Sequence, residues 1–284
     1  MIRRSSVLAT PYLFGLILLV GLPSIAAFAL AFTEYSGIQP PEFNGLDNFR
    51  WLTSDSLFWT SFVNSLIFIA LFVPLRVGGA VGAALLLHRR SRAAVIGRPI
   101  AYLPTVMPDV AYALVWLWLL NPIYGPIAAT LQGAGLGSPE FLTDEWTTRV
   151  AVVVMGAFQI GEGFVVALAA RRALPHSIYE AAEVDGASPW FTLTRVTLPL
   201  MAPVLLLLAF RDLIVSFQLN FVPALIITEG GPRLATTFVP LYVYRAAFTY
   251  FRFGYAAAAS LLLFAVTAIV VLVQYRLARR WRFL

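Results

Sequence analysis

The stretch Pro175–Trp190 is a polar island between two long apolar runs, and its residue types are suited to recognising a protein surface. Three carboxylates surround two alanines in it: Glu180, Glu183 and Asp185 around Ala181 and Ala182. The alanines let a partner surface approach closely, and the carboxylates give the patch an acidic edge. The chemistry offered here is docking to a soluble protein.

The local pattern predicts a helix, a glycine turn and a second helix within about 177–197. Ser177 and Glu180 match a capping box, in which each side chain accepts a hydrogen bond from the other residue's backbone N–H. Gly186 can take the left-handed conformation that ends a helix, and Ser188–Pro189 can begin the next one. The first helix is too short to be stable alone in water, so we expect it to pack against a partner.

Polar side chains also occur inside the apolar runs, where they can recognise a solute. Amides and carboxylates next to aromatic rings can bind the hydroxyl groups of a polar solute, and the candidates with these groups are Gln159, Glu162, Phe217, Gln218 and Asn220. A charge at a lipid-facing helix centre costs about 2.5–3.5 kcal/mol. We therefore expect ion pairs within the helix bundle, with Arg76, Asp109, Arg211 and Asp212 as the candidates. These charges are either structural or part of a solute path, and a misplaced span boundary is a further alternative for Arg211 and Asp212.

These residues must be positioned by membrane-spanning helices. The 284-residue chain is 60% hydrophobic and 12% charged, whereas soluble domains have about 25% charged residues. Its apolar residues form blocks long enough to cross a bilayer. We expect an all-α integral membrane fold, a single transmembrane domain over 1–284, with a retained first helix and six spans at about 10–33, 61–87, 99–121, 148–170, 201–227 and 254–275.

The loop arginines indicate the orientation of these spans. If both termini are cytoplasmic, the inner segments hold Arg3, Arg4, Arg89, Arg90, Arg92, Arg98, Arg171, Arg172, Arg195, Arg276, Arg279, Arg280 and Arg282. The outer segments then hold only Arg50, Arg149, Arg233, Arg245 and Arg252. Cytoplasmic loops carry the excess of basic residues, so we expect this orientation. The net charge of +6 follows from it and does not argue for nucleic-acid binding.

Two residue types are missing, and their absence excludes several chemistries. The chain has no Cys and no Lys, so it offers no thiol nucleophile, no P-loop lysine for ATP phosphates and no Schiff-base amine. If ATP drives this protein, a different subunit hydrolyses it. We also expect no metal site, because His88 and His176 have no ligand partners near them in the sequence.

The docking segment resembles a known family motif. Glu180–Ala182, Asp185–Ala187 and Leu198–Pro199 are similar to the EAA motif of binding-protein-dependent ABC importer permeases. Other stretches resemble the carbohydrate branch, the permeases for maltose-type oligosaccharides, trehalose and glycerol 3-phosphate. These are Leu103–Pro104, Trp116, Asn121–Pro122 with Gly125, Thr228–Pro232 with Thr236, and Phe253–Ala256.

The resemblance implies a permease without its own ATPase site, in a bacterial plasma membrane. A coupling helix between spans four and five would seat in a cleft of the ATPase through Glu180, Ala181, Ala182, Asp185 and Gly186. The implied partners are a second homologous permease, an ATPase dimer that binds ATP and Mg²⁺, and an extracytoplasmic binding protein. Two other functions are weighed against it. An ion-coupled secondary transporter is supported only by the intramembrane carboxylates, and a membrane enzyme lacks any catalytic motif.

Overall fold

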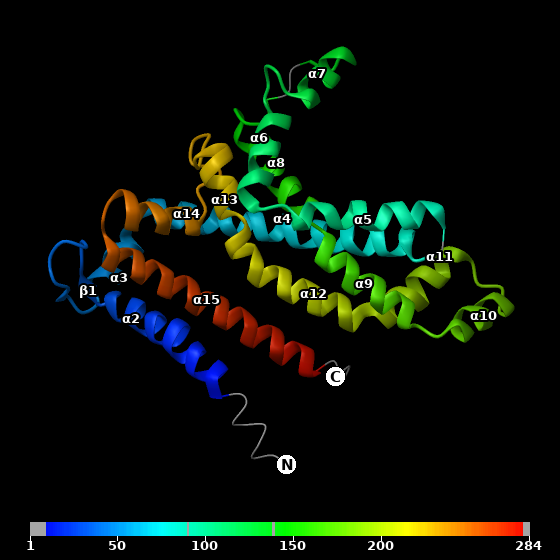
Figure 1. Ribbon diagram of the computed structural model, residues 1–284, viewed down its shortest axis with the longest axis horizontal. Helices are drawn as coiled ribbons and strands as arrows, with labels where there is room; N and C mark the ends of the chain where they lie inside the picture. The colour runs from blue at the N-terminus through cyan, green and yellow to red at the C-terminus, as the bar shows by residue number, and fades with distance from the viewer. Residues whose placement is uncertain (1–9, 90, 138–139, 281–284) are drawn as a thin grey trace. The chain divides into compact units, whose positions relative to one another are not determined.

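The computed structural model describes residues 10–89, 91–137 and 140–280, without the side chains of 277–280, and most of them are helical (Figure 1). Arg3, Arg4, Arg90 and Arg282, and the side chains of Arg279 and Arg280, lie outside the described residues. The chain divides into two compact units. The first joins Met1–Trp59 to Leu241–Ile269, and the second joins Thr60–Pro240 to Val270–Leu284.

The first unit combines helices from both ends of the chain with one small sheet. Strands β1 and β2 pair antiparallel, with Thr33 opposite Phe43 and Glu34 opposite Glu42. Gly254 lies directly against the Thr33 carbonyl, where a Cβ atom would clash, so the start of α15 can approach β1 closely. The elements are the helix from Thr10 with a π-helical turn at Ile17–Gly21, α2 (Leu22–Leu30), β1 (Thr33–Glu34), β2 (Glu42–Phe43), α3 (Asp47–Ser54), the π-helical turn Arg245–Thr249 and α15 (Phe253–Arg280).

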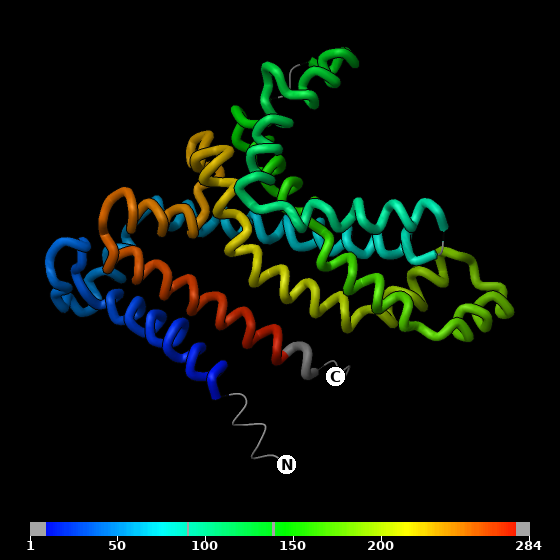
Figure 2. The backbone as a smooth tube through the Cα atoms, viewed as in Figure 1, coloured from blue at the N-terminus to red at the C-terminus, as the bar shows by residue number. Residues whose placement is uncertain are grey.

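The second unit is a helical bundle. Its core is built where α4, α9 and α12 meet, with Ala80, Phe164 and Leu208 each at most 5% exposed. Helix α9 also packs along α5, and Figure 2 traces both helices in the backbone tube. The elements are α4 (Ser56–Leu87), α5 (Arg92–Val106), α6 (Asp109–Leu119), α7 (Pro126–Gly133), α8 (Glu145–Phe158), α9 (Gly161–Ala173), α10 (His176–Val184), α11 (Pro189–Phe191), the π-helical turn Thr192–Thr197, α12 (Leu198–Leu219), α13 (Phe221–Pro223) and the π-helical turn Ala224–Thr228. Helix α14 (Val239–Tyr244) begins in this unit and continues into the first one at Leu241.

Among the described residues, four helical segments are long and apolar enough to cross a membrane, and two bent pairs of helices raise the number to as many as six. The four are Thr10–Leu30, Ser56–Leu87, Pro189–Thr228 and Phe253–Arg276. They coincide with the first, second, fifth and sixth predicted spans. The bent pairs, α5 with α6 and α8 with α9, occupy the third and fourth.

The predicted spans 99–121 and 148–170 each contain a break between two helices. Helices α5 and α6 meet at 105°, and α8 and α9 meet at 51°. The first break falls at Met107, which is extended (φ −70°, ψ 135°) before Pro108, because the proline ring disfavours helical geometry in the residue before it. The second falls at Gln159 (φ −78°, ψ 57°). There the Thr105 hydroxyl accepts a hydrogen bond from the Gly161 N–H at 2.9 Å, so this backbone donor stays satisfied.

Candidate functional site

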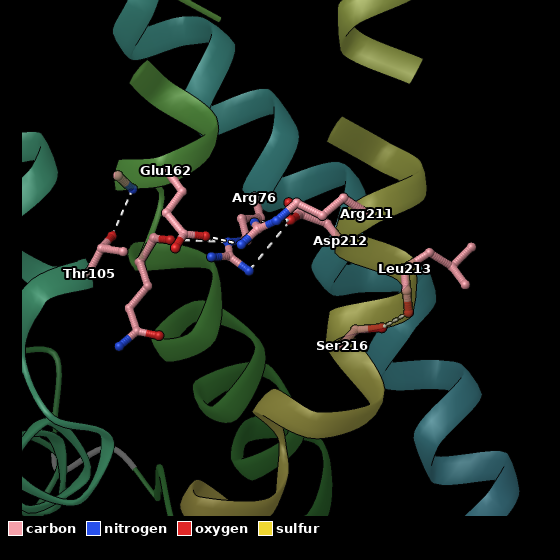
Figure 3. Close-up of polar contacts among 9 residues, drawn as sticks. Arg76, Thr105, Glu162, Arg211, Asp212, Leu213 and Ser216 are labelled. Atoms are coloured by element: carbon pink, nitrogen blue, oxygen red, sulfur yellow. Dashed lines mark hydrogen bonds and ion pairs between the residues drawn. The ribbon is translucent and has the colours of Figure 1, made fainter. Parts of the chain in front are cut away.

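Four charged side chains from three helices form a continuous ladder in the second unit (Figure 3). Arg76 of α4 lies 3.6 Å from Asp212 of α12, measured from Nη1 to Oδ1. The same Asp212 oxygen accepts a hydrogen bond from Arg211 Nη1 at 3.0 Å. Arg211 also pairs through Nη2 with Glu162 in the first turn of α9. The ladder has two positive and two negative members, so its formal charges cancel.

The two ends of the ladder lie in different environments. The side chains of Arg76 and Asp212 are only 5% and 3% exposed, whereas those of Arg211 and Glu162 are 39% and 49% exposed. Of the charges expected to pair, Arg76, Arg211 and Asp212 each have an oppositely charged neighbour in the ladder. Arg211 and Asp212 lie inside the apolar helical segment Pro189–Thr228.

Asp109 is not part of this ladder. It is the first residue of α6, directly after the 105° bend, and it is exposed. No ion pair to it exists among the described residues, so the pairing predicted for it is not found there. A carboxylate at a helix N-terminus is stabilised by the helix dipole, which accounts for Asp109 without a partner.

The structure brings only some of the predicted solute-binding residues together. Gln159 lies at the break between α8 and α9, and its backbone carbonyl accepts a hydrogen bond from Arg76 Nε at 3.0 Å. Its side-chain amide reaches the Pro104 carbonyl at 3.4 Å. Gln159 therefore borders the ladder, and Glu162 is a member of it.

The other three candidates lie further along α12. Phe217 is 4% exposed and Asn220 is fully buried, whereas Gln218 is exposed. Neither amide atom of Asn220 has a hydrogen-bond partner within the described residues. A buried unsatisfied polar group costs about 1–3 kcal/mol, so Asn220 is a predicted solute contact whose amide is not used within the described chain.

The docking segment has the predicted helix–turn–helix form, with one difference. Helix α10 begins at His176, its N-cap is Pro175, and no side chain caps it. The capping box predicted for Ser177 and Glu180 was therefore wrong. Because the helix starts before Ser177, the Glu180 carboxylate instead pairs with the His176 ring at 2.8 Å, one turn away.

The end of α10 follows the prediction. Gly186 has φ +71°, the Gly186 N–H bonds the Glu183 carbonyl at 3.0 Å and the Ala187 N–H bonds the Ala182 carbonyl at 2.9 Å. These two bonds form a Schellman motif. The Ser188 hydroxyl then accepts a hydrogen bond from the Phe191 N–H at 3.2 Å, as expected of an N-cap.

Helix α10 has no buried residue. Of the five seating residues, only Ala182 is half-buried, and the exposed ones are Glu180, Ala181, Asp185 and Gly186. Apolar side chains are exposed beside them, with Val184 at 87% and Trp190 at 72%. A short helix that exposes both its acidic and its apolar residues has a free face for a protein partner.

One side chain ties α10 to the bundle, and the sequence did not reveal it. The Tyr179 hydroxyl lies 3.1 Å from the Thr197 hydroxyl, which is 3% exposed. The Arg171 guanidinium of α9 lies 4.3 Å from the centre of the Tyr179 ring. Tyr179 thus joins α10 both to the end of α9 and to the start of α12. One hint of this role lay in the sequence, namely that Tyr179 directly precedes Glu180 of the docking segment.

Comparison with known proteins shows which family combines these features. Residues 76–283 match the family described as "binding-protein-dependent transport system inner membrane component". The chain belongs to this family. The matched range includes the charged ladder and the whole docking segment.

Relatives and solved structures agree with this assignment. The permease is 30% identical over 277 residues to the probable ABC transporter permease YesP of Bacillus subtilis, covering 96% of this chain and 89% of the relative. It is 31% identical to the lactose transport permease LacF of Rhizobium radiobacter, covering 84% and 82%. A bacterial ABC transporter involved in alginate import has a chain of the same fold, with a TM-score of 0.86, 25% identity and coverage of 98% and 97%.

The permease is accordingly a multi-pass membrane subunit without an ATPase site of its own, and a separate subunit supplies the ATPase. The membrane-enzyme and secondary-transporter alternatives are not supported by this family. Of the three intramembrane carboxylates that favoured ion coupling, Glu162 and Asp212 are paired with arginines in the ladder, and Asp109 lies outside it.

Proposed function

We propose that this permease imports a sugar or sugar derivative delivered by an extracytoplasmic binding protein. The relatives' names support this choice of solute, since they include lactose, starch degradation products and sn-glycerol 3-phosphate. A second homologous permease completes the membrane unit. An ATPase dimer binds ATP and Mg²⁺, and this chain holds no cofactor.

The exposed docking segment carries the proposal. Glu180, Ala181, Ala182, Asp185 and Gly186 form the surface that seats in the ATPase. The Schellman turn at Gly186 gives that surface a fixed end, and Tyr179 connects it to two helices of the bundle. Closure of the ATPase dimer can therefore move α9 and α12 through α10.

The proposed topology has six spans, both termini in the cytoplasm and α10 on the cytoplasmic side, within a single permease domain over 1–284 in a bacterial plasma membrane. Counting each bent helix pair as one span supports the number six. The arginine distribution supports the orientation. Outer segments 35–60 and 121–147 then face the binding protein.

The ladder locates the solute path in this proposal. Arg211 lies near the middle of the segment Pro189–Thr228, yet its pair with Glu162 is partly exposed on this subunit. Lipid at that depth would be unfavourable for both charges. The exposed pair therefore faces a wet passage shared with the second permease, and Gln159, Phe217, Gln218 and Asn220 supply further candidate contacts along it.

The test replaces Gly186 by aspartate and measures sugar uptake and sugar-stimulated ATPase activity in the assembled importer. Gly135→Asp is the matched control, because Gly135 (φ +75°) has the same left-handed backbone as Gly186 (φ +71°) and neither has an atom within 4 Å of an added Cβ. We expect Gly186→Asp to insert normally and to abolish uptake, while Gly135→Asp keeps it. Normal ATP-driven uptake by Gly186→Asp, or uptake by this chain alone that an uncoupler collapses, would contradict the proposal.

A further inference from the structure

A cavity of about 370 Å³ lies within the first unit, and none of the residues discussed so far as a functional site contributes to it. Its walls come from β1, the loop that follows, β2, α3 and the start of α15. Ligand-binding pockets in proteins span about 300–1,000 Å³. The cavity is thus large enough for a small molecule, and its lining decides which kind.

Asn48 of α3 supplies a buried acceptor in the wall. The residue is 2% exposed, and its side-chain N–H₂ group donates to the Ala31 carbonyl at 3.0 Å and to the Thr33 carbonyl at 2.8 Å. Both amide hydrogens are used, which fixes the orientation of the side chain. Its Oδ1 atom has no hydrogen-bond partner among the described residues, so it remains free to accept from a ligand.

Two carboxylates of the sheet add further acceptors. Glu34 and Glu42 are directly opposite each other in the antiparallel pair, and both line the cavity. Like charges in this position are destabilising, and neither has an ion-pair partner in the part of the chain that the structure describes. Gln39, in the connecting loop, brings an amide with donors and an acceptor. The lining is therefore rich in acceptors for hydroxyl groups.

Aromatic rings complete the lining. Trp51 is 48% exposed and Tyr255 is 5% exposed, and both border the cavity. The Arg252 guanidinium lies 4.3 Å from the centre of the Tyr255 ring and 6.0 Å from that of Trp51. Rings beside carboxylates and amides are the combination that binds the apolar faces and the hydroxyls of a sugar.

A hydrogen-bonded carboxylate holds one of these rings in place. Asp55 Oδ2 accepts hydrogen bonds from the Tyr255 hydroxyl at 3.0 Å and from the Tyr242 hydroxyl at 2.6 Å. Burial opposes ionisation of Asp55, but the hydrogen bonds from Tyr242, Leu57 and Tyr255 outweigh it and keep the pKa of Asp55 below its ordinary value. Because the charged carboxylate anchors the tyrosine, this wall is formed before any ligand arrives.

We propose that this cavity binds a neutral sugar of one or two rings, with Trp51 as the stacking face and Gln39, Glu42 and Asn48 as hydrogen-bonding groups. The inference rests on the proposed function, since the topology places this loop outside the membrane, where a sugar released by the binding protein arrives first. The lining holds two carboxylates, Glu34 and Glu42, and one guanidinium, Arg252, so its net negative charge disfavours an anionic sugar. A metal ion is a poor occupant, because no group of three potential ligand side chains occurs among the described residues.

The experiment measures sugar binding to the full-length permease, purified with its partner subunits in detergent and without ATP. Saturation-transfer NMR would be recorded with maltose, trehalose, lactose and glucuronate. We expect at least one of the three disaccharides to bind and glucuronate not to bind. Trp51→Ala should weaken binding by about three- to tenfold, the size of an aromatic contact, and Gln39→Ala should also weaken it. Trp59→Ala is the matched control, because Trp59 is 46% exposed in the same unit but does not line the cavity.

Three results would overturn the inference: no binding of any of the three disaccharides, binding that Trp51→Ala and Gln39→Ala leave intact, or equal losses in Trp51→Ala and Trp59→Ala. Thermal melting of each variant shows whether it is folded. The outcome is separate from that of the proposed function, because binding is measured without ATP turnover. If no sugar binding is found while ATP-driven uptake is normal, only the cavity site is refuted. The docking segment is tested separately, by the coupling of sugar uptake to ATPase activity.

Discussion

Neutralising Asp212 should destabilise the permease far more than neutralising Glu162, although both belong to one ladder. Asp212→Asn preserves shape but leaves Arg76, whose side chain is 5% exposed, without an anion. Breaking a buried ion pair costs about 3–5 kcal/mol. Glu162→Gln removes a partner from a pair that is 39% and 49% exposed, and such pairs contribute only about 0–1 kcal/mol.

The assay is unfolding of the purified protein in mixed micelles, monitored by tryptophan fluorescence across a denaturing-detergent titration. The double variant Arg76→Met with Asp212→Leu serves as the control. It removes both buried charges and leaves the Arg211–Glu162 pair intact, and replacing a buried pair by apolar residues is often neutral or stabilising. We therefore expect it to recover most of the stability lost in Asp212→Asn. Equal losses in Asp212→Asn and Glu162→Gln, or a double variant less stable than Asp212→Asn, would refute the argument from burial.

The remaining predictions concern two hydrogen-bonded tyrosine clusters. Tyr179→Phe removes the bond to Thr197 but keeps the ring beneath Arg171. This substitution should lower the free energy of unfolding by about 1 kcal/mol. It should also lower the ratio of sugar transported to ATP hydrolysed, which is measured in proteoliposomes. Tyr102→Phe, on an exposed tyrosine, is the control, and an unchanged ratio would show that α10 needs no such anchor. Because the pKa of Asp55 is lowered in the folded state, its contribution to stability is present above about pH 4 and is lost as the pH falls through the lowered pKa. Asp55→Asn lacks this contribution throughout, so its melting temperature should fall less than that of the native permease between about pH 5 and about pH 3. Parallel pH profiles for the two proteins would contradict that assignment.

Several features could be read from the sequence because their causes are local. The apolar blocks indicate spans because bilayer thickness sets helix length. Gly186 could be assigned to a turn because a left-handed residue is easiest for glycine. Ser188 and Pro189 could be assigned to a helix start because a serine side chain caps a helix N-terminus and proline fits the first helical position. The docking segment was therefore predicted with its turn and second helix correct.

Other features were not read from the sequence. Helix α10 begins ahead of Ser177, and the His176–Glu180 pair forms within its first turns in place of a capping box. The break at Gln159 is accommodated because Thr105, on another helix, satisfies the Gly161 N–H. Sequence alone indicated that Met107 precedes a proline, but not that the chain would bend by 105° there.

Composition thus determined that this chain is a helical membrane protein with an acidic, glycine-turned segment between two apolar runs, since hydropathy and glycine geometry act over a few residues. Only the tertiary structure decided which charges are paired. It placed Arg76, Glu162, Arg211 and Asp212 in one ladder and left Asp109 at a helix end. The reason is physical: a charge in a membrane helix is stabilised by whatever group packing brings within a few ångströms, and that distance is set by three helices remote in sequence.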